Sequence, residues 1–251
     1  MSNSSALSSS CCALILAAGK GTRMHSKKPK VLHTILGEPL LGHVAGALRP
    51  LFGEAVWAVI GHEADMVRAA FAGRDLRFVE QKEQLGTGHA VLSAKEQMKG
   101  FDGAVLVIFG DNPIITGETY QMAADKVKEG YAVVVLGFRP ADAARYGRLV
   151  MENGELKKIV EFKDASDEEK AINLCNSGCM CFDGKTMFEL LEAIGNENAA
   201  GEYYLTDAVA VARQKGLKCT VVECSPEEVA GANTREELAL LESFLNKRKG
   251  K

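Results

Sequence analysis

Short runs of consecutive apolar residues alternate with longer amphipathic stretches along the first half of the chain. The apolar runs are strand-sized and lie at Ala13–Leu16, Ala55–Ile60, Leu76–Val79, Ala104–Phe109 and Ala132–Gly137. Because their Val, Ile, Leu and Phe content is continuous, these strands are expected to be buried on both faces, as in a parallel sheet. Helical spacing of apolar residues marks the segments Leu40–Leu48, Ala64–Ala72, Gly88–Lys99 and Thr116–Glu129. Repeated strand–helix units predict an α/β fold with right-handed crossovers.

The second half of the chain breaks this rhythm. Asn153-Gly154 separates two strand-like segments, Arg148–Met151 and Leu156–Glu161, and Asn-Gly is a strong hairpin signal. The charged segment Lys163–Lys170 is expected to be a loop or a short helix. Further strands are expected at Leu174–Phe182 and Lys218–Glu223, and helices at Lys185–Ile194, Thr206–Lys215 and Thr234–Arg248. The pattern predicts a mixed, mainly parallel sheet flanked by helices, Rossmann-like, with a small hairpin subregion that forms a lid or a subsite on this core.

Composition narrows the class of protein. The chain has 251 residues, of which 47% are apolar and 25% charged, and its net charge is −3. Such a chain can bury a sizeable core, so disorder as its main state is excluded. Aromatic residues make up only 6% and no long basic run occurs, which disfavours nucleic acid as a partner. The apolar runs are too short to span a membrane, so no membrane partner is expected.

The N-terminal segment and the cysteines bear on organisation and location. Met1–Ser10 is rich in serine and lacks the basic residues of a signal peptide, so residues 1–10 are interpreted as a flexible leader. Residues 11–251 are then expected to form a single domain. The seven cysteines include no CxxC pair and are interpreted as small buried hydrophobic residues of a cytoplasmic protein.

A glycine-rich segment, Leu16–Met24, follows the first predicted strand. Its two glycines allow a tight turn and offer backbone N–H groups to phosphate oxygens, while Lys20, Arg23 and the nearby Lys30 supply cations. It is neither a Walker A motif nor a dinucleotide fingerprint, because Met24 stands where each requires glycine. On these residues alone, an ordinary glycine-rich turn remains an equal alternative to a phosphate-binding loop.

A wider set of motifs resembles the sugar-nucleotide pyrophosphorylase family. The resemblance covers about Ala13 to Leu245 and is greatest to the uridylyltransferase half of the bifunctional bacterial enzymes that make UDP-N-acetylglucosamine. It rests on the glycine-rich segment and on the following blocks: Pro29-Lys30-Val31-Leu32, Gln81-x-x-Gln84-Leu85-Gly86-Thr87-Gly88-His89-Ala90, Phe109-Gly110-Asp111-x-Pro113, Tyr146-Gly147-Arg148, Glu161-x-Lys163-Asp164, Asn176-x-Gly178, Gly201-Glu202-Tyr203-Tyr204-x-Thr206-Asp207 and Gly231-x-Asn233.

In the reaction that the resemblance implies, a sugar 1-phosphate attacks the α-phosphorus of UTP and pyrophosphate leaves. Both reactants are anions, so charge neutralisation and in-line positioning are the main catalytic needs. Arg23 and Lys30 are the predicted catalytic cations. The amide of Gln81 is expected to pair with the imide edge of uracil. The predicted nucleotide-binding residues are Leu16, Ala17, Ala18, Gly19, Lys20, Gly21, Gln81, Gly86 and Thr87.

Asp111 follows the strand Ala104–Phe109, where ligands of open α/β sheets bind. By resemblance, Asn233 is its partner in an oxygen-only site suited to Mg²⁺. Simpler interpretations remain for each residue: Asp111 as a turn residue, Asn233 as the residue before a helix cap, Arg23, Lys30 and Gln81 as solvated side chains. The sugar is expected to contact five residues, again by resemblance: Gly147, Glu161, Asn176, Tyr204 and Thr206. His33 and His89 are interpreted as structural.

The chain contains no hexapeptide repeats, so the left-handed β-helix that carries the acetyltransferase of the bifunctional enzymes is not expected in it. That part largely holds the family's trimer together, and the oligomeric state therefore stays open. The expected function is Mg²⁺-dependent uridylyl transfer from UTP to N-acetylglucosamine 1-phosphate. The alternatives are a pyrophosphorylase for glucose 1-phosphate or N-acetylmuramic acid 1-phosphate, an NAD-binding dehydrogenase, and a non-catalytic sugar-nucleotide sensor.

Overall fold

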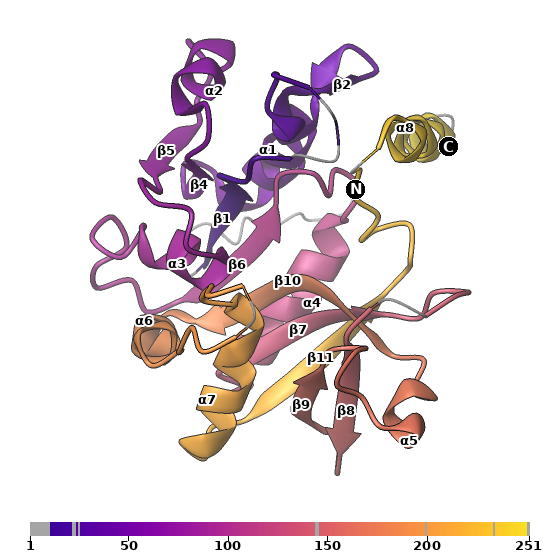
Figure 1. Ribbon diagram of the computed structural model, residues 1–251. Helices are drawn as coiled ribbons and strands as arrows, with labels where there is room; N and C mark the ends of the chain where they lie inside the picture. Colours follow the sequence, from indigo (N-terminus) through magenta and orange to yellow (C-terminus); the bar gives the residue numbers. More distant parts are fainter. Residues whose placement is uncertain are drawn as a thin grey trace, which may run out of the picture.

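A single nine-stranded sheet forms the centre of the protein (Figure 1). The computed structural model describes residues 11–21, 24, 26–143, 146–198, 200–232 and 234–249. The strand order is β11-β7-β10-β6-β1-β4-β5, with β8 paired to β10 and β9 paired to β8. The strands of this sheet are β1 (Cys11–Ala17), β4 (Val56–Ile60), β5 (Arg77–Glu80), β6 (Ala104–Phe109), β7 (Val133–Phe138), β8 (Arg148–Glu152), β9 (Glu155–Val160), β10 (Cys175–Asp183) and β11 (Cys219–Cys224).

Most strand pairs are parallel, and the predicted mixed α/β class is confirmed. β1 pairs in parallel with β4 and β6, β4 with β5, and β7 with β11. β10 is inserted between β6 and β7 and runs antiparallel to both. The sequence predicted this strand but not its place, because nothing local specifies which distant strands it joins.

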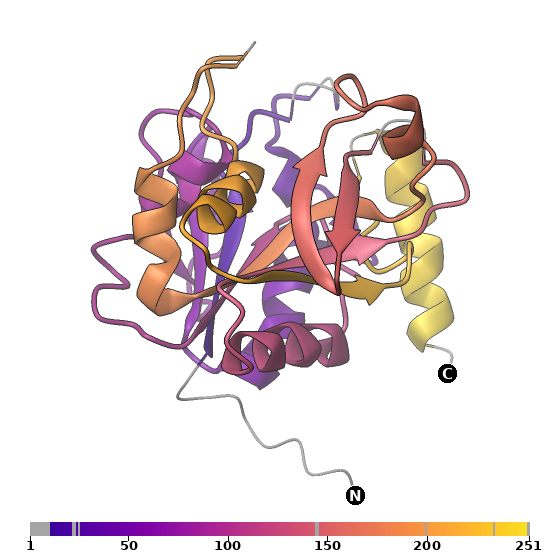
Figure 2. The same ribbon diagram turned by 90° about the horizontal axis from the view of Figure 1, so that it is seen from below.

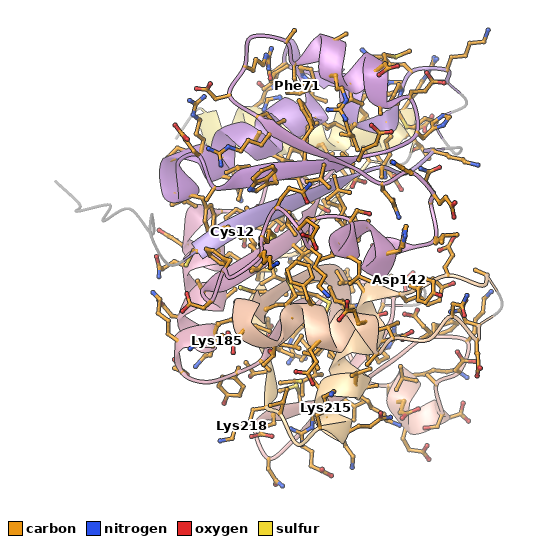
Figure 3. All side chains as sticks on the ribbon, turned by 90° about the vertical axis from the view of Figure 1, so that its left-hand side faces the viewer. Cys12, Phe71, Asp142, Lys185, Lys215 and Lys218 are labelled. Carbon is orange, nitrogen blue, oxygen red and sulfur yellow. The ribbon has the colours of Figure 1, made fainter. Side chains whose placement is uncertain are left out.

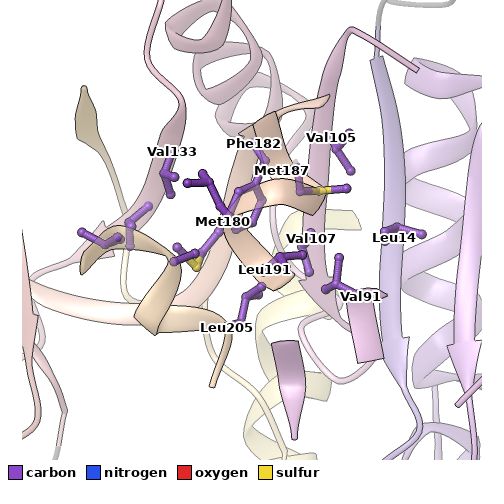
Figure 4. Packing of buried hydrophobic residues seen from close by; sticks show 14 of the residues in the cluster. Leu14, Val91, Val105, Val107, Val133, Met180, Phe182, Met187, Leu191 and Leu205 are labelled. Carbon is purple, nitrogen blue, oxygen red and sulfur yellow. The ribbon is translucent and has the colours of Figure 1, made fainter. Parts of the chain in front are cut away.

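Helices cover both faces of the sheet, which explains the continuous apolar runs. In β1, Ala13 and Ile15 belong to one core cluster, whereas Leu14 and Leu16 belong to the other. Burying each leucine or isoleucine stabilises the fold by roughly 1.5–3 kcal/mol. The first face is covered by α1 (Leu40–Phe52), α2 (Ala64–Ala70) and α4 (Gly117–Lys128), and the second by α3 (Thr87–Leu92), α6 (Gly184–Glu192) and α7 (Ala208–Gln214). Figure 2 shows the layers edge-on, and Figure 4 shows the packing of the second cluster.

Smaller elements complete the structure. α8 (Arg235–Lys249) packs through Leu241 on Ile35, close to the ribbon formed by β2 (Thr34–Ile35) and β3 (Glu38–Pro39). The cap predicted at the start of this helix is present, because Thr234 Oγ1 accepts from the Glu237 N–H at 3.2 Å. The remaining elements are α5 (Asp167–Lys170) and the 3-10 turns η2 (Lys30–Leu32) and η3 (Leu205–Asp207).

One predicted helix is shorter than expected. The pattern predicted Gly88–Lys99, but α3 ends at Leu92 and hydrogen-bonded turns follow it. The Ala94 N–H bonds to the carbonyl three residues earlier rather than four, which tightens the backbone. The burial of Ala94 and Met98 continues the apolar spacing through these turns, so periodicity alone could not mark the end.

The two halves of the chain lie at opposite ends of the sheet. In Figure 3, Phe71, which follows α2, lies near one end, whereas Lys215 and Lys218, between α7 and β11, lie near the other. Six of the seven cysteines are buried, as their apolar interpretation predicted, and Cys224 is half-buried. Within the described part of the chain, no helix is long and apolar enough to cross a membrane.

Candidate active site

A cavity of about 510 Å³ opens at the edge of the sheet where β1, β5 and β6 end. All nine predicted nucleotide-binding residues line it, as do Lys30 and Asp111. The structure therefore brings these eleven residues together, although their individual roles remain predictions. Five further residues, to which the sequence assigned no site role, also line the cavity: Val31, Gln84, Ala90, Phe109 and Glu202.

The glycine-rich segment turns back toward Lys30. Gly21 has φ +58°, and a Cβ added there would lie 2.8 Å from Lys30 Cβ, so only glycine fits this turn. Gly19 differs, because it has no left-handed φ and an added Cβ would meet no atom within 4 Å. Gly19 lines the cavity, and its backbone conformation does not itself require glycine. Arg23, the other predicted catalytic cation, lies outside the described residues.

Lys30 and Asp111 form an ion pair in the lining of this cavity. Lys30 Nζ lies 2.6 Å from Asp111 Oδ2, and the two side chains are 21% and 12% exposed. The turn after β6 is fixed by the Gly110 N–H, which donates to Leu16 O at 2.9 Å. Partial burial makes such a charge-assisted contact stronger than one at the surface. Hence Asp111 holds the Lys30 ammonium beside the glycine-rich segment.

The surroundings of Asp111 fit an oxygen-bound divalent cation. Gly231 packs so closely that an added Cβ would lie 3.0 Å from Asp111 Oδ2, so the carboxylate faces backbone rather than an apolar side chain. Among the described residues, no group of three or more His, Cys, Asp or Glu side chains is arranged to hold a metal. One carboxylate supplemented by substrate oxygens suits Mg²⁺. Asn233, the predicted second ligand, lies outside the described residues.

Gln81 is buried at the floor of the cavity, with 3% of its surface exposed. Its Nε2 donates to Gly86 O at 3.1 Å and lies 3.1 Å from His89 Nδ1. Both amide hydrogens are therefore directed at protein atoms, and Oε1 is left for a ligand. The amide nitrogen of Gln81 thus makes its contacts within the protein, and the role of this side chain toward the base stays a prediction. His89, interpreted as structural, contacts the Gln81 amide through Nδ1.

The segment after Leu85 is bound to the segment around Tyr203. The Gly88 N–H donates to Tyr203 O at 2.8 Å, and Thr87 Oγ1 accepts from the Leu205 N–H at 2.9 Å. Gly86 has φ +110°, and an added Cβ would lie 2.6 Å from Tyr203 O. These contacts place η3, which contains Thr206 and directly follows Tyr204, beside the nucleotide cavity.

Three of the predicted sugar-binding residues are neighbours. The Asn176 N–H donates to Gly147 O at 2.9 Å, and a Cβ added to Gly147 would lie 3.3 Å from Glu161 Oε1. Burial, followed by the charges of Asp164 and Asp207, raises the pKa of Glu161. Asp207 belongs to η3. The charge of Asp207 acts on the Glu161 carboxylate. The group formed by Gly147, Glu161 and Asn176 therefore lies within electrostatic range of η3, which contains Thr206 and follows Tyr204.

The predicted sugar residues do not line the nucleotide cavity itself. The connection between the two regions is a bulge in β10 after Asn176. There Gly178 has φ +82°, and an added Cβ would lie 2.7 Å from the Phe109 ring, which does line the cavity. Asn176 Oδ1 accepts from the Gly178 N–H at 2.9 Å, which fixes its side chain in the bulge.

Arg148 is a buried cation for which the sequence predicted no role. It is 2% exposed, it donates to Ala143 O at 2.6 Å and to Tyr146 O, and it lies 5.5 Å from the centre of the Phe162 ring. These bonds hold the segment that carries Gly147. The signal in the sequence was the block Tyr146-Gly147-Arg148.

The fold and this site define a nucleotidyltransferase. Residues 13–163 match the model of the MobA-like NTP transferase domain, and the chain belongs to this family. Its curated relatives include the bifunctional protein GlmU of Ruegeria sp., 51% identical over 92% of this chain and 51% of the relative. The bifunctional protein GlmU of Rhodospirillum rubrum is 50% identical over 94% of this chain and 53% of the relative. The chain thus spans about half the length of these relatives.

Solved structures support the fold alone, because their sequences are distant. A putative glucose-1-phosphate thymidylyltransferase from Bacillus anthracis superposes with a TM-score of 0.76 at 20% identity, covering 93% of this chain and 94% of that one. A UDP-glucose pyrophosphorylase in complex with UDP-glucose gives 0.73 at 19% identity, covering 95% and 99%. Family membership sets aside the NAD-binding dehydrogenase that the sequence had left open. Enzymes of this family generally use a divalent metal.

Proposed function

We propose that the chain transfers uridylyl from UTP to N-acetylglucosamine 1-phosphate, forming UDP-N-acetylglucosamine and pyrophosphate. The main support for the proposal is that one cavity is lined by the glycine-rich segment, the Lys30–Asp111 pair and the buried Gln81 side chain. These elements supply phosphate-binding backbone, positive charge and a base-reading group within one space. The proposal also draws on the relatives named GlmU, which are about half identical over the matched region.

In the proposed reaction, a phosphate oxygen of the sugar 1-phosphate forms a bond to the α-phosphorus of UTP. The bond from that phosphorus to the bridging oxygen breaks, and its electron pair leaves with pyrophosphate. No covalent enzyme intermediate is needed, so catalysis rests on alignment and charge neutralisation. The N–H groups of Gly19 and Gly21 bind phosphate oxygens, and the Lys30 ammonium stabilises the charge that grows on pyrophosphate.

Asp111 is proposed to hold Mg²⁺, with Asn233 as a second ligand. When bound, the cation neutralises phosphate charge and polarises the α-phosphate for attack. The Lys30–Asp111 contact at 2.6 Å means that the ammonium and a metal ion compete for one carboxylate. Lys30 is therefore expected to exchange Asp111 for a phosphate oxygen when substrate enters.

Gln81 is proposed to accept a hydrogen bond from N3–H of uracil through Oε1. Cytosine has no hydrogen on N3. The lone pair of cytosine N3 would therefore face a lone pair of Gln81 Oε1 in a buried site. A mismatched buried polar pair of this kind costs about 1–3 kcal/mol. UTP should therefore be preferred over CTP, and purine nucleotides should be excluded by size as well.

The sugar is proposed to bind between the hairpin and η3, against Gly147, Glu161, Asn176, Tyr204 and Thr206. Asn176 can donate to and accept from an N-acetyl group, and the Glu161 carboxylate can accept from a sugar hydroxyl. Glucose 1-phosphate lacks the N-acetyl carbonyl and would leave one polar group unpaired. This predicts a preference of roughly 10- to 100-fold for N-acetylglucosamine 1-phosphate.

The test is a pyrophosphate-release assay over a panel of nucleotides and sugar phosphates. UTP with N-acetylglucosamine 1-phosphate should give the highest kcat/KM, and release should require a divalent cation. A preference for glucose 1-phosphate or N-acetylmuramic acid 1-phosphate would keep the reaction class and replace the substrate. Binding of UDP-N-acetylglucosamine without turnover of any pair would instead support a sugar-nucleotide sensor. A cytoplasmic location is also proposed, because UTP is an intracellular substrate.

A further inference from the structure

Glu228 is a buried carboxylate that the proposed reaction does not use. It is 8% exposed and belongs to the segment 225–232, from which its side chain reaches the start of α4. Oε1 accepts from the hydroxyls of Thr119 at 2.6 Å and Thr116 at 2.7 Å, and from the Thr116 N–H at 3.1 Å. Oε2 accepts from the Ser225 N–H at 3.1 Å and its hydroxyl at 3.3 Å. All five donors are neutral groups, and together they replace the water that the carboxylate loses.

The two carboxylate oxygens bind two different parts of the chain. Among the described residues, the hydrogen bonds to Oε1 come from the start of α4, whereas those to Oε2 come from Ser225, at the beginning of the segment 225–232. Thr116 and Thr119 are more than a hundred residues away from Glu228 in sequence. Glu228 therefore acts as a clamp that fixes the segment 225–232 on the first turn of α4.

The clamped segment lies against the proposed metal ligand. Val229 O accepts from Asn112 Nδ2 at 2.8 Å, and Asn112 directly follows Asp111. Gly231 packs against the carboxylate, since an added Cβ would lie 3.0 Å from Asp111 Oδ2. Any shift of the segment 225–232 would thus move two groups that set the orientation of Asp111.

We propose that Glu228 is a positioning residue of the metal site, acting through the segment 225–232 on Asp111. The proposal rests on the proposed function only in taking Asp111 as a metal ligand. Groups that orient metal ligands without touching the ion typically change metal affinity by about 10- to 100-fold. Glu228→Gln keeps the size of the side chain but turns one acceptor into a donor. Its NH₂ group must then face either the threonine or the Ser225 donors, so one side of the clamp opens.

The experiment measures Mn²⁺ affinity of the full chain by electron paramagnetic resonance of the free ion, alongside the melting temperature. Glu228→Gln should weaken Mn²⁺ binding about 10-fold. Thr119→Val, which removes one hydroxyl at constant shape, should weaken it less, and Thr119→Ser should restore it. The control is Met187→Ala, in the core cluster on the opposite face of the sheet, which should lower the melting temperature and leave Mn²⁺ affinity unchanged.

Asp111→Asn separates the positioning role of Glu228 from the assignment of Asp111 as a metal ligand. If Asp111→Asn weakens Mn²⁺ binding and Glu228→Gln does not, the positioning role of Glu228 is wrong and the metal assignment stands. If Asp111→Asn itself leaves the affinity unchanged, the metal assignment of the proposed function fails. Equal weakening by Glu228→Gln and Met187→Ala would show a general loss of stability and would overturn the proposal.

Discussion

The nucleotide side and the sugar side of the proposed site are built in different ways. On the nucleotide side, chemistry-bearing residues follow the carboxyl ends of the parallel strands β1, β5 and β6, and backbone hydrogen bonds join their turns to the sheet. The Gly110 N–H donates to Leu16 O at 2.9 Å, and the Gln81 N–H donates to Ile60 O at 2.8 Å. These side chains take their positions from the hydrogen-bonded strands of the sheet.

On the sugar side, the residues come from a hairpin, a bulge and a 3-10 turn. Asn176 lies where the register of β10 shifts, and Gly147 precedes β8 in a segment held by the buried Arg148. Their positions depend on contacts between loops rather than on strand ends. We therefore expect substitutions on the nucleotide side to affect the chemical step. Substitutions on the sugar side should mainly change which sugar binds.

The largest effect is expected at the Lys30–Asp111 pair. Asp111→Ala and Lys30→Gln should each lower kcat at least ~10²-fold, the scale for losing one preorganised electrostatic stabiliser. Asp102→Asn and Lys27→Gln are matched controls at exposed positions outside the cavity and should keep wild-type turnover. Steady-state kinetics measure both, and near-normal kcat in Asp111→Ala would remove the metal assignment.

The next effect concerns the base. Gln81→Leu should lower kcat/KM for UTP by roughly 10- to 100-fold, because a buried acceptor for the N3–H is lost. CTP should be affected little, so the ratio of UTP to CTP efficiency should fall. Competition between the two nucleotides measures this ratio directly. If the wild-type protein uses UTP and CTP equally, Gln81 does not read the base.

A smaller effect, confined to the sugar, is expected on the other side of the site. Asn176→Ala should reduce the preference for N-acetylglucosamine 1-phosphate over glucose 1-phosphate by about 10-fold, whereas Glu161→Ala should weaken both substrates. KM should change more than kcat in both variants. A drop in kcat alone, with the sugar preference intact, would contradict the division between the two sides.

Two glycines test whether the nucleotide turn is more constrained than the hairpin turn. Gly154, with φ +79°, has no atom within 4 Å of an added Cβ, whereas Gly21 would meet Lys30 at 2.8 Å. Gly154→Ala should cost only the left-handed penalty, about 1–2 kcal/mol, and keep activity. Gly21→Ala should cost more and also reduce kcat by displacing Lys30. Urea unfolding with parallel kinetics measures both; equal costs would contradict the comparison.

The smallest effect is a pH dependence of stability. Burial alone would raise the pKa of Glu228, but hydrogen bonds from Thr119, Thr116 and Ser225 together lower it below the ordinary glutamate value. The ionised carboxylate therefore stabilises the fold above the ordinary glutamate pKa, and this contribution is lost as the pH falls through the lower folded pKa. Glu228→Gln should be less stable than wild type at neutral pH, with a gap that narrows on acidification. A gap independent of pH in urea unfolding would refute this.

The sequence predicted best what depends on neighbouring residues. The run Ala104–Phe109 coincides with β6, so the position of Asp111 at a strand end followed directly. The register between distant strands was not predictable, and neither was the insertion of β10 between β6 and β7. The same limit applies to side-chain pairing: the amide of Gln81 is occupied by His89 and Gly86, and Glu228 meets Thr116 and Thr119 only in the folded chain.

The central claim is that the cavity at the carboxyl edge of the sheet transfers uridylyl between two anionic substrates. Phosphorus NMR of the full chain with UTP, N-acetylglucosamine 1-phosphate and Mg²⁺ tests it most directly. We expect one UDP-N-acetylglucosamine for each pyrophosphate, formation of both only when both substrates are present, and loss of both signals in Asp111→Ala. Pyrophosphate formed without the sugar phosphate, or product formed at the same rate by Asp111→Ala, would contradict it.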